Sequence, residues 1–463
     1  MMKASMTLAG LLLIGLVLSD PVFAAEAPQH PGVGDDSVEL WDRYFEAREG
    51  GRSDDALEMA IRLRDLAEAE NGNTSTEYAV ALAEVGISRL LREDHDLAYA
   101  DLTLAEDLLA GQLPLYSEKL IRALTFLGAS LSNRGRYDEA LQAYSRAQHI
   151  THRQWGTEND AQIPLTYAKA DVLQALGDRH LANEQQQLAV KLHRVNHGET
   201  SPQAIAAAAR YGTWLRSLGE YDGAIAVFHE ALSEVQGRGP DRPESLPLLR
   251  GMAHAYRGGY RGKFARGMYE RIIELMESQP EAFSVDQQVE ARLVFGDWLM
   301  QRYFERQAVA QYEAAYAVAA AAGPDGAHWL PQFAEPQLVR NGDMAPFKVA
   351  GDDRHVTFQF RVTDDGRIRS AKVSETSAGS RDSSRARQQF PKLTRYRPAI
   401  VDGKARGEDT MTTTMYLLPD GVALEPEPVA APARLTSRDA VAVSNWTLLR
   451  GPDAMTLDIN EDD

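Results

Sequence analysis

Apolar positions follow a helical period over residues 124–147, where two short amphipathic helices are predicted with Gly135 between them. Small residues at Gly128 and Ala140 would let the two helices approach closely, while larger apolar side chains fill the space around them. Residues 211–231 repeat the same order of large and small side chains. The pattern therefore predicts a helical hairpin that occurs more than once along the chain.

The hairpin returns at a nearly constant interval, which is 42 residues over the first five copies of the second-helix marker. That marker is a small residue, and a second marker, also mostly small, lies in the first helix of each copy. The second-helix markers are Ala56, Ala98, Ala140, Ala182, Ala224, Gly267 and Ala308, and the first-helix markers are Tyr44, Gly86, Gly128, Ala170, Gly212, Ala255 and Gly296. Seven copies therefore tile residues 37–327, and they must stack because none can bury its apolar face alone.

This order of large and small residues resembles the tetratricopeptide repeat, or TPR. The usual TPR has about 34 residues, so the longer period is similar to the repeats of kinesin light chains, in which the second helix is extended. The resemblance implies a solenoid whose first helices line a concave groove that holds peptides. We therefore expect a mostly α chain, with a TPR-type α-solenoid followed by a small α+β domain.

The register places several polar residues on the first helices, where they would face such a groove. They can contact a peptide there, or they can be ordinary solvated positions on helices. The peptide-groove candidates are Arg122, Asn133, Tyr167, Asp171, Arg216, Tyr256 and Asp297.

The sixth copy departs from the others. Gly258, Gly259, Gly262 and Gly267 crowd the region between its helices, although a glycine costs about 1 kcal/mol in a helix relative to alanine. Either this unit is loosely packed, or its backbone must come close to another group. We favour a flexible joint at this point.

The helical period stops after residue 323, and strand patterns follow. Val356, Phe358, Phe360 and Val362 alternate with polar residues, as in a half-buried strand. The expected elements are a strand at 356–362, a turn at 364–367, a returning strand at 368–375, a helix at 382–393 and a last strand at 410–418. These elements predict a small α+β domain over residues 328–420.

The stretches VTFQFRVTDDGRI and RYRPAIVDGKA, with a helix between them and a closing strand, resemble the C-terminal domain of the TonB family of energy transducers. The Tyr-Pro that usually opens such domains is missing. The membrane helix and the long Pro-rich spacer of that family are missing as well. The resemblance therefore implies the fold and a docking edge for a peptide or protein, and it does not imply energy transduction.

The last strand is the predicted docking edge, because an unpaired strand can add an extended peptide through its backbone. Thr412, Thr414 and Tyr416 face away from the core there and would flank the partner. The edge can instead be protected by the tail, or it can pair with its twin in a dimer.

Charge is divided unevenly along the chain. Residues 328–420 contain 15 Lys and Arg against 12 Asp and Glu, while the whole chain has a net charge of −18. Basic residues gather around the helix expected at 382–393 and form a basic face. This face can dock on the acidic solenoid, bind an anionic envelope polymer or partner, or simply be solvated. Its residues are Arg381, Arg385, Arg387, Lys392, Arg395 and Arg397.

Residues 1–24 have the pattern of a signal peptide: Lys3 gives a positive start, and the apolar run at 7–18 is shorter than the roughly 20 residues that span a membrane. We expect cleavage, although a retained anchor is the alternative. The mature chain would then begin with a flexible leader (25–36), carry no transmembrane segment and reside in the periplasm. Residues 421–463 are expected to form an acidic, Pro-containing tail.

Several classes of function are disfavoured. The net charge of −18 disfavours nucleic-acid binding, and the chain has no cysteine for thiolate metal sites or nucleophilic catalysis. The pairs His149/His152 and His193/His197 have metal-binding spacing, but no third ligand can be placed. No catalytic motif stands out. We therefore expect no cofactor, no metal and no enzymatic activity.

The leading hypothesis is a non-enzymatic periplasmic scaffold, which binds a protein or peptide of the cell envelope through its groove and its TonB-like domain. An alternative is an accessory of TonB-dependent transport that engages outer-membrane receptors by strand addition. A third hypothesis is an enzyme in the solenoid groove.

Overall fold

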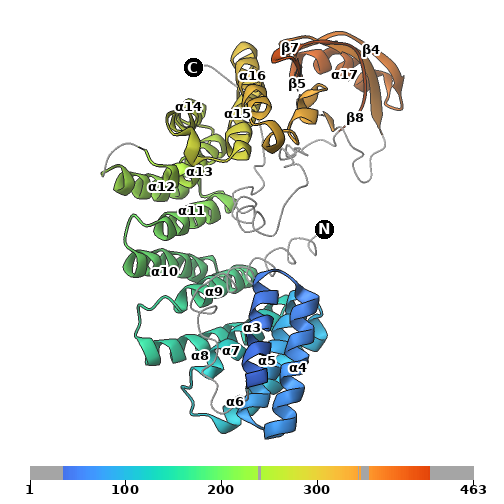
Figure 1. Cartoon of the computed structure of the whole chain (residues 1–463). Coiled ribbons are helices and arrows are strands. Elements are labelled where there is room, and N and C mark those ends of the chain that lie inside the picture. Colours follow the sequence, from blue (N-terminus) through green and yellow to red (C-terminus); the bar gives the residue numbers. More distant parts are fainter. Residues whose placement is uncertain (1–34, 238–240, 342–343, 346–353, 418–463) are drawn as a thin grey trace. The chain divides into compact units, whose positions relative to one another are not determined.

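The computed structural model describes residues 35–237, 241–341, 344–345 and 354–417 (Figure 1). In this part of the chain, fourteen α-helices come first, and eight strands with one further α-helix follow. The predicted signal peptide and tail lie outside the described residues. The predicted leader overlaps the first helix at residues 35 and 36. The structure divides into two compact units, whose described parts are residues 35–211 and 212–417.

The described part of the first unit consists of helical hairpins. From α3 to α10 each helix packs on the next, and the first helices of neighbouring hairpins also touch, α5 on α7 and α7 on α9. The apolar core therefore continues from one hairpin to the next. The helices are α3 (Asp35–Glu49), α4 (Ser53–Asn71), α5 (Thr76–Leu91), α6 (His95–Gln112), α7 (Lys119–Asn133), α8 (Tyr137–Trp155), α9 (Gln162–Leu176), α10 (Arg179–His197) and α11 (Pro202–Ser217), within which the unit ends.

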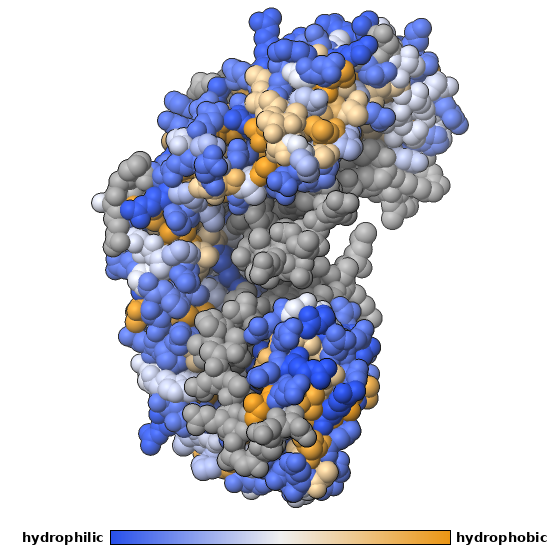
Figure 2. Space-filling model, viewed as in Figure 1, coloured by the Kyte–Doolittle hydropathy of each residue, from blue (hydrophilic) through white to orange (hydrophobic). Residues whose placement is uncertain are grey.

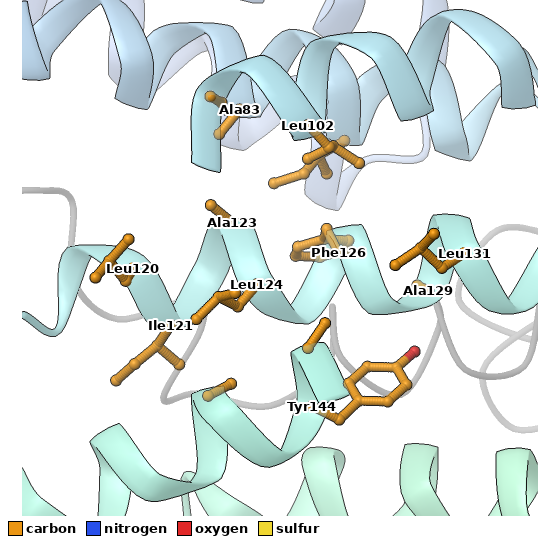
Figure 3. Packing of buried hydrophobic residues seen from close by; sticks show 14 of the residues in the cluster. Ala83, Leu102, Leu120, Ile121, Ala123, Leu124, Phe126, Ala129, Leu131 and Tyr144 are labelled. Carbon is orange, nitrogen blue, oxygen red and sulfur yellow. The ribbon is translucent and has the colours of Figure 1, made fainter. Parts of the chain in front are cut away.

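Close contact between a small and a large residue holds these hairpins together. Figure 3 shows α7 passing between Leu102 of α6 and Tyr144 of α8. A Cβ atom at Gly86 would lie 2.7 Å from the Leu102 side chain, and one at Gly128 would lie 2.7 Å from the Tyr144 ring. Both separations are too short for any real Cβ, so each of these two glycines receives a large side chain from a second helix.

The second unit continues with hairpins of the same kind. The Phe228 ring lies against two glycines, since a Cβ at Gly212 or Gly251 would be 2.5 or 2.3 Å from it. In the last hairpin, a Cβ at Gly296 would lie 2.4 Å from the Tyr312 ring. The helices are α12 (Tyr221–Gln236), α13 (Leu246–Gly258), α14 (Gly262–Ser278), α15 (Val285–Gln301) and α16 (Glu305–Ala321), with short 3₁₀ turns η1 (Pro243–Ser245), η2 (Pro280–Ala282), η3 (Gly323–Asp325) and η4 (Leu330–Phe333).

The second-helix marker predicted for the sixth hairpin, Gly267, is wrong by two residues. Ala265, rather than Gly267, is the fully buried small residue of α14, and it lies four residues before the buried Tyr269. In α13, the predicted first-helix marker Ala255 is fully buried, as is Ala253 two residues before it.

The glycine at the end of α13 has a packing reason. A Cβ at Gly258 would lie 2.2 Å from the Tyr221 ring of α12, so the backbone approaches this side chain closely. Close approach was the alternative to a flexible joint, and it accounts for Gly258. Gly267 has open space around it, since a Cβ there would meet nothing within 4 Å.

A four-stranded antiparallel sheet and one helix form the C-terminal domain. The strand order is β2-β8-β3-β4. α17 packs on β4, and the Phe390 ring stacks on Phe358 of β3 with centroids 4.0 Å apart. The strands and helix predicted for this domain are present with ends within two residues of those expected. Their bounds are β2 (Met344–Ala345), β3 (His355–Val362), β4 (Ile368–Thr376), α17 (Ser380–Leu393) and β8 (Glu408–Leu417).

Two short strand pairs were not predicted. β1 (Gln337–Asn341) pairs with β5 (Thr394–Arg397), and β6 (Ala399–Val401) pairs with β7 (Lys404–Arg406). Asp402 and Gly403 form the tight turn between β6 and β7, both with positive φ, of 52° and 79°.

The described surface visible in Figure 2 is mostly hydrophilic, with smaller apolar areas between the polar ones. Within the described ranges, none of the helices combines the length and the apolar character that a bilayer crossing requires.

Candidate binding groove and domain junction

Arg122, a groove candidate, belongs to a buried ion network that joins three helices. Its guanidinium donates to both carboxylate oxygens of Glu84 in α5, with 2.8 Å from Nη2 to Oε2. The Tyr44 hydroxyl donates to Oε2 of Glu84 at 2.6 Å, and Arg48 is 3.8 Å from it. Burial alone would raise the pKa of Glu84, but Arg122, Arg48 and Tyr44 together lower it. Arg122 therefore contributes to the stacking of the first three hairpins.

Tyr167 and Asp171, two groove candidates from α9, are brought together around Arg210 of α11. The Arg210 guanidinium lies over the Tyr167 ring, 3.7 Å from its centroid. Its Nη2 is 3.8 Å from Oδ2 of Asp171, and its buried Nη1 makes no hydrogen bond to any described atom. We call Tyr167, Asp171 and Arg210 the Arg210 cluster. Asp171 remains partly exposed, so the cluster can be reached from solvent.

Burial shapes the electrostatics of the Arg210 cluster. Burial raises the pKa of the Asp171 carboxyl, and Arg210 opposes this shift. His193 of α10 lies beside Tyr167, with ring centroids 6.2 Å apart. Burial, together with the nearby His197 and Arg210, lowers the pKa of His193 to about 4. The imidazole is therefore neutral at pH 7.

The histidine pairs do not assemble a metal site in the described residues. The rings of His193 and His197 are 5.6 Å apart, and His152 pairs with the Gln162 side chain. Within those residues, no group of three or more histidine and acidic side chains is placed to hold an ion.

The other groove candidates belong to four different helices. Asn133 is the last residue of α7 and is half-buried. Arg216, near the end of α11, is buried, and Tyr256 of α13 stacks on Phe264 with centroids 5.3 Å apart. Asp297 of α15 contacts the C-terminal domain. A role of these residues in peptide binding stays a prediction.

The predicted basic face divides into an exposed part and a buried part. Arg381, Arg385, Arg387 and Lys392 are exposed, whereas Arg395 and Arg397 are buried. Arg397 donates from Nη2 to both oxygens of Asp297, at 3.1 and 2.9 Å. Arg395 donates to Glu305 of α16 at 3.2 Å. The buried part of this face therefore docks on acidic residues of the last hairpin, which is one of the outcomes considered from the sequence.

Further contacts join the C-terminal domain to the last hairpin, and we call this contact region the domain junction. The Tyr312 hydroxyl donates to Oδ1 of Asp297 at 2.8 Å, and Arg367 is 3.3 Å from Glu305. Arg340 of β1 donates to the backbone oxygen of Gln301 at 2.6 Å. A repeat array needs a polar covering on its terminal repeat, and β1 and β5 pack on α15 in that position.

The predicted sheet edge is paired on one side and partly on the other. β8 pairs with β3 along most of its length, and β2 pairs with β8 only at Tyr416 and Leu417. Thr412 is exposed, whereas Thr414 is half-buried and shares a hydrogen bond with Thr357. In the described part of the chain, residues 408–415 therefore have a strand partner on one side only.

No model of a known protein family matches the chain, and no curated protein matches it either. Similar solved structures include BtubC (BKLC) from P. vanneervenii, with 18% identity, a TM-score of 0.38 and coverage of 52% of this chain and 92% of that one. The C-terminal part of a TPR repeat-containing protein from Cytophaga hutchinsonii has 16% identity, a TM-score of 0.39 and coverage of 61% and 94%. YrrB, a TPR protein with an unusual peptide-binding site, has 20% identity, a TM-score of 0.30 and coverage of 47% and 95%. Kinesin-light-chain-like repeats are also among these neighbours.

Small and large residues meet at nearly the same interval in hairpin after hairpin, in both units. The helical part is a TPR-like solenoid. The predicted fold class, a mostly α chain with such a solenoid followed by a small α+β region, is therefore confirmed.

The sequence analysis named Tyr167 and Asp171 as groove candidates but did not name Arg210. Arg210 lies two residues before the Gly212 marker, in a position that looked like an ordinary helix surface. An arginine within an otherwise small, apolar run, AIAAAARYG, was the available signal.

Proposed function

We propose that this protein is a non-enzymatic scaffold of the bacterial periplasm that binds an extended peptide segment of an envelope protein at the Arg210 cluster. The observation that carries the proposal is the Arg210 guanidinium, which is stacked on Tyr167, is only weakly paired with Asp171 and finds no hydrogen-bond acceptor for Nη1 among the described residues. A desolvated donor that is left unpaired costs about 1–3 kcal/mol, and a ligand could supply its acceptor.

The chemistry of the cluster fits a peptide backbone. Arg210 offers donors and Asp171 offers an acceptor within 4 Å of each other, which matches the alternating C=O and N–H groups of an extended chain. The Tyr167 ring provides a rigid apolar surface beside them, and such aromatic and arginine residues commonly dominate binding energy at interfaces.

In-cell photo-crosslinking tests this proposal. A photoreactive amino acid at Gln174, three residues beyond Asp171 on α9, is expected to capture an envelope protein, and Arg210→Gln should reduce that capture at least tenfold. The same amino acid at the exposed Arg179 of α10 serves as the matched control. Equal capture from both positions, or capture that Arg210→Gln leaves unchanged, would refute the proposal.

A separate experiment tests the proposed periplasmic location of the protein. The proposal requires residues 1–24 to direct export and to be removed. Mass spectrometry of the protein from a periplasmic fraction should give an N-terminus near residue 25. A full-length chain that stays in the cytoplasmic fraction would contradict the proposed location.

A second candidate function is an accessory of TonB-dependent transport, with a TonB-like C-terminal domain that adds a strand from an outer-membrane receptor. The one-sided pairing of residues 408–415 supports it, because an edge strand can accept another chain. A photoreactive amino acid at Thr412 should then capture a receptor. The same amino acid at Ser374, on the opposite edge strand β4, should not, and equal capture from the two strands would exclude this function.

A further inference from the structure

The turn inside each hairpin needs one residue in the left-handed region. Glycine supplies it in four hairpins, at Gly51, Gly135, Gly177 and Gly219, with φ between 69° and 86°. The second hairpin uses Glu93, with φ of 66°. The sixth and seventh hairpins use tyrosine instead, Tyr260 with φ of 57° and Tyr303 with φ of 63°.

A tyrosine is a poor residue for that backbone conformation. Its Cβ clashes with the following carbonyl oxygen in the left-handed region, whereas glycine has no such clash. Neither ring is buried in the core, because 60% of Tyr260 and 40% of Tyr303 is exposed, although the Tyr303 ring lies 4.8 and 4.7 Å from the guanidinium groups of Arg340 and Arg395. Strain that folding does not require is commonly found at sites of recognition.

Other aromatic side chains gather beside these two turns. Phe264, at the start of α14, is 58% exposed, and Phe304, before α16, is 42% exposed. The two turns are close in space, since Arg266 of α14 lies 5.5 Å from the centroid of the Phe304 ring. Tyr260, Phe264, Phe304, Arg261 and Arg266 are called the aromatic turn surface below.

This surface is basic within an acidic protein. Residues 257–266 contain four Lys and Arg and no acidic residue, while the whole chain has a net charge of −18. Among the described residues, Arg261 and Arg266 each have an acidic partner on the surface, Asp222 and Glu270, both at 2.8 Å, and the glutamates of a bound segment would compete with these two. Exposed aromatic rings between arginines fit an acidic segment that also carries proline, because proline-rich chains bind in extended form on aromatic side chains.

The chain carries such a segment directly after β8. Residues 418–432 contain four prolines, three acidic residues and no basic residue, including the run Glu425-Pro426-Glu427-Pro428. The end of β8 also lies near the aromatic turn surface. Leu417 pairs with Met344, which is four residues from Arg340, and the Arg340 guanidinium lies 4.8 Å from the Tyr303 ring centroid. The path from Leu417 through Met344 and Arg340 to the Tyr303 ring is roughly 20 Å long. The eight residues that lead from Leu417 to Glu425 can span up to about 27 Å when extended, so they are long enough to cover this distance.

We propose that residues 418–432 dock in extended form on the aromatic turn surface, with their prolines against Tyr260, Phe264 and Phe304 and their glutamates beside Arg261 and Arg266. This contact ties the tail to the sixth and seventh hairpins. It is independent of the peptide proposed for the Arg210 cluster, which belongs to the other unit.

Competition between the tail and a matching peptide tests the docking. A fluorescent peptide of residues 418–432 is titrated into full-length protein and into the full-length variant Glu425→Lys/Glu427→Lys, whose own tail should no longer compete. The peptide is expected to bind the variant at least tenfold more tightly than the unchanged protein. No binding to the variant, or equal binding to both proteins, would overturn the proposal, even if another acidic peptide binds.

Tyr260→Gly, made in the tail variant, separates docking from folding. It removes one aromatic ring and relieves the left-handed strain, so the protein should fold at least as well while peptide binding falls tenfold or more. Glu93→Gly is the matched control, because it relieves the same strain in the second hairpin and should leave peptide binding unchanged. Equal peptide affinity in the Tyr260→Gly and Glu93→Gly variants would also overturn the proposal.

Discussion

Arg397 of β5 forms a two-oxygen contact with Asp297 of α15, at 3.1 and 2.9 Å, across a hundred residues of sequence. Both side chains are largely withdrawn from water, and the Tyr312 hydroxyl also donates to Asp297. Burial alone would lower the pKa of Arg397, but Asp297 and Tyr312 together raise it. The C-terminal domain therefore covers the last hairpin with a buried, charged contact.

Removing one partner of this contact should be costly. Arg397→Ala leaves the Asp297 carboxylate buried without its cation, and we expect a loss of about 3–5 kcal/mol in the free energy of unfolding of the second unit. Lys404→Ala is the control, because Lys404 is 82% exposed and its contact with Glu313 should contribute no more than about 1 kcal/mol. Urea unfolding checks both, and equal effects of the two substitutions would contradict the junction described here.

Replacing glycine by alanine should have opposite effects on stability at two positions of the second unit, because one glycine is closely packed and the other is not. Gly251→Ala places a methyl group 2.3 Å from the Phe228 ring, so it should destabilise by about 1–3 kcal/mol. Gly267→Ala places the same group in open space inside α14 and should stabilise by up to about 1 kcal/mol. Thermal unfolding of both variants measures the difference, and a stabilising Gly251→Ala would be incompatible with this packing.

The first unit should lose stability in mild acid because of His193. Its pKa is lowered to about 4 from an ordinary value of 6.5. Between these values the unfolded chain binds a proton that the folded chain does not, so the free energy of unfolding falls as the pH falls. His193→Phe keeps a ring beside Tyr167 and should remove this part of the pH dependence. Urea midpoints at pH 7 and pH 5 measure it, and an unchanged difference in the variant would rule His193 out.

Arg122 should stabilise the first unit most when Glu84 is ionised. The pKa of Glu84 is lowered in the folded state, so its stabilising contribution is present above the ordinary carboxyl pKa and is lost as the pH falls through the folded value. Arg122→Met should therefore be strongly destabilising at pH 7 and less so in acid. Stability curves of both proteins from pH 7 downward test this, and a constant difference would argue against the network.

The hairpins could be predicted because their packing repeats in sequence. Gly86, Gly128, Gly212 and Gly296 each accept a large side chain, and a Cβ at any of them would be too close to it. The second-helix marker of the sixth hairpin was misplaced, because the interval alone does not distinguish Gly267 from Ala265, two residues before it. The regular spacing of the hairpins in the sequence predicts that neighbouring helices contact each other. It does not show which of two nearby small residues makes the contact.

The domain junction could be predicted only as one of several outcomes. Arg395 and Arg397 had the same basic character as Arg381 and Arg385, yet only the first two are buried. Their partners on α15 and α16 are ninety or more residues away, and the strands that position them are too short and polar to show a period. Arg210 was missed for a related reason, since its partner Tyr167 belongs to the preceding hairpin.

Hydrogen exchange read out by mass spectrometry tests most directly whether the last hairpin and the C-terminal domain form one cooperative unit. The slowest amides of α15 and β5 are predicted to open with the same free energy in the unchanged protein, and Arg397→Ala should accelerate both to a similar extent. Unequal opening of α15 and β5, with Arg397→Ala accelerating β5 alone, would contradict the account.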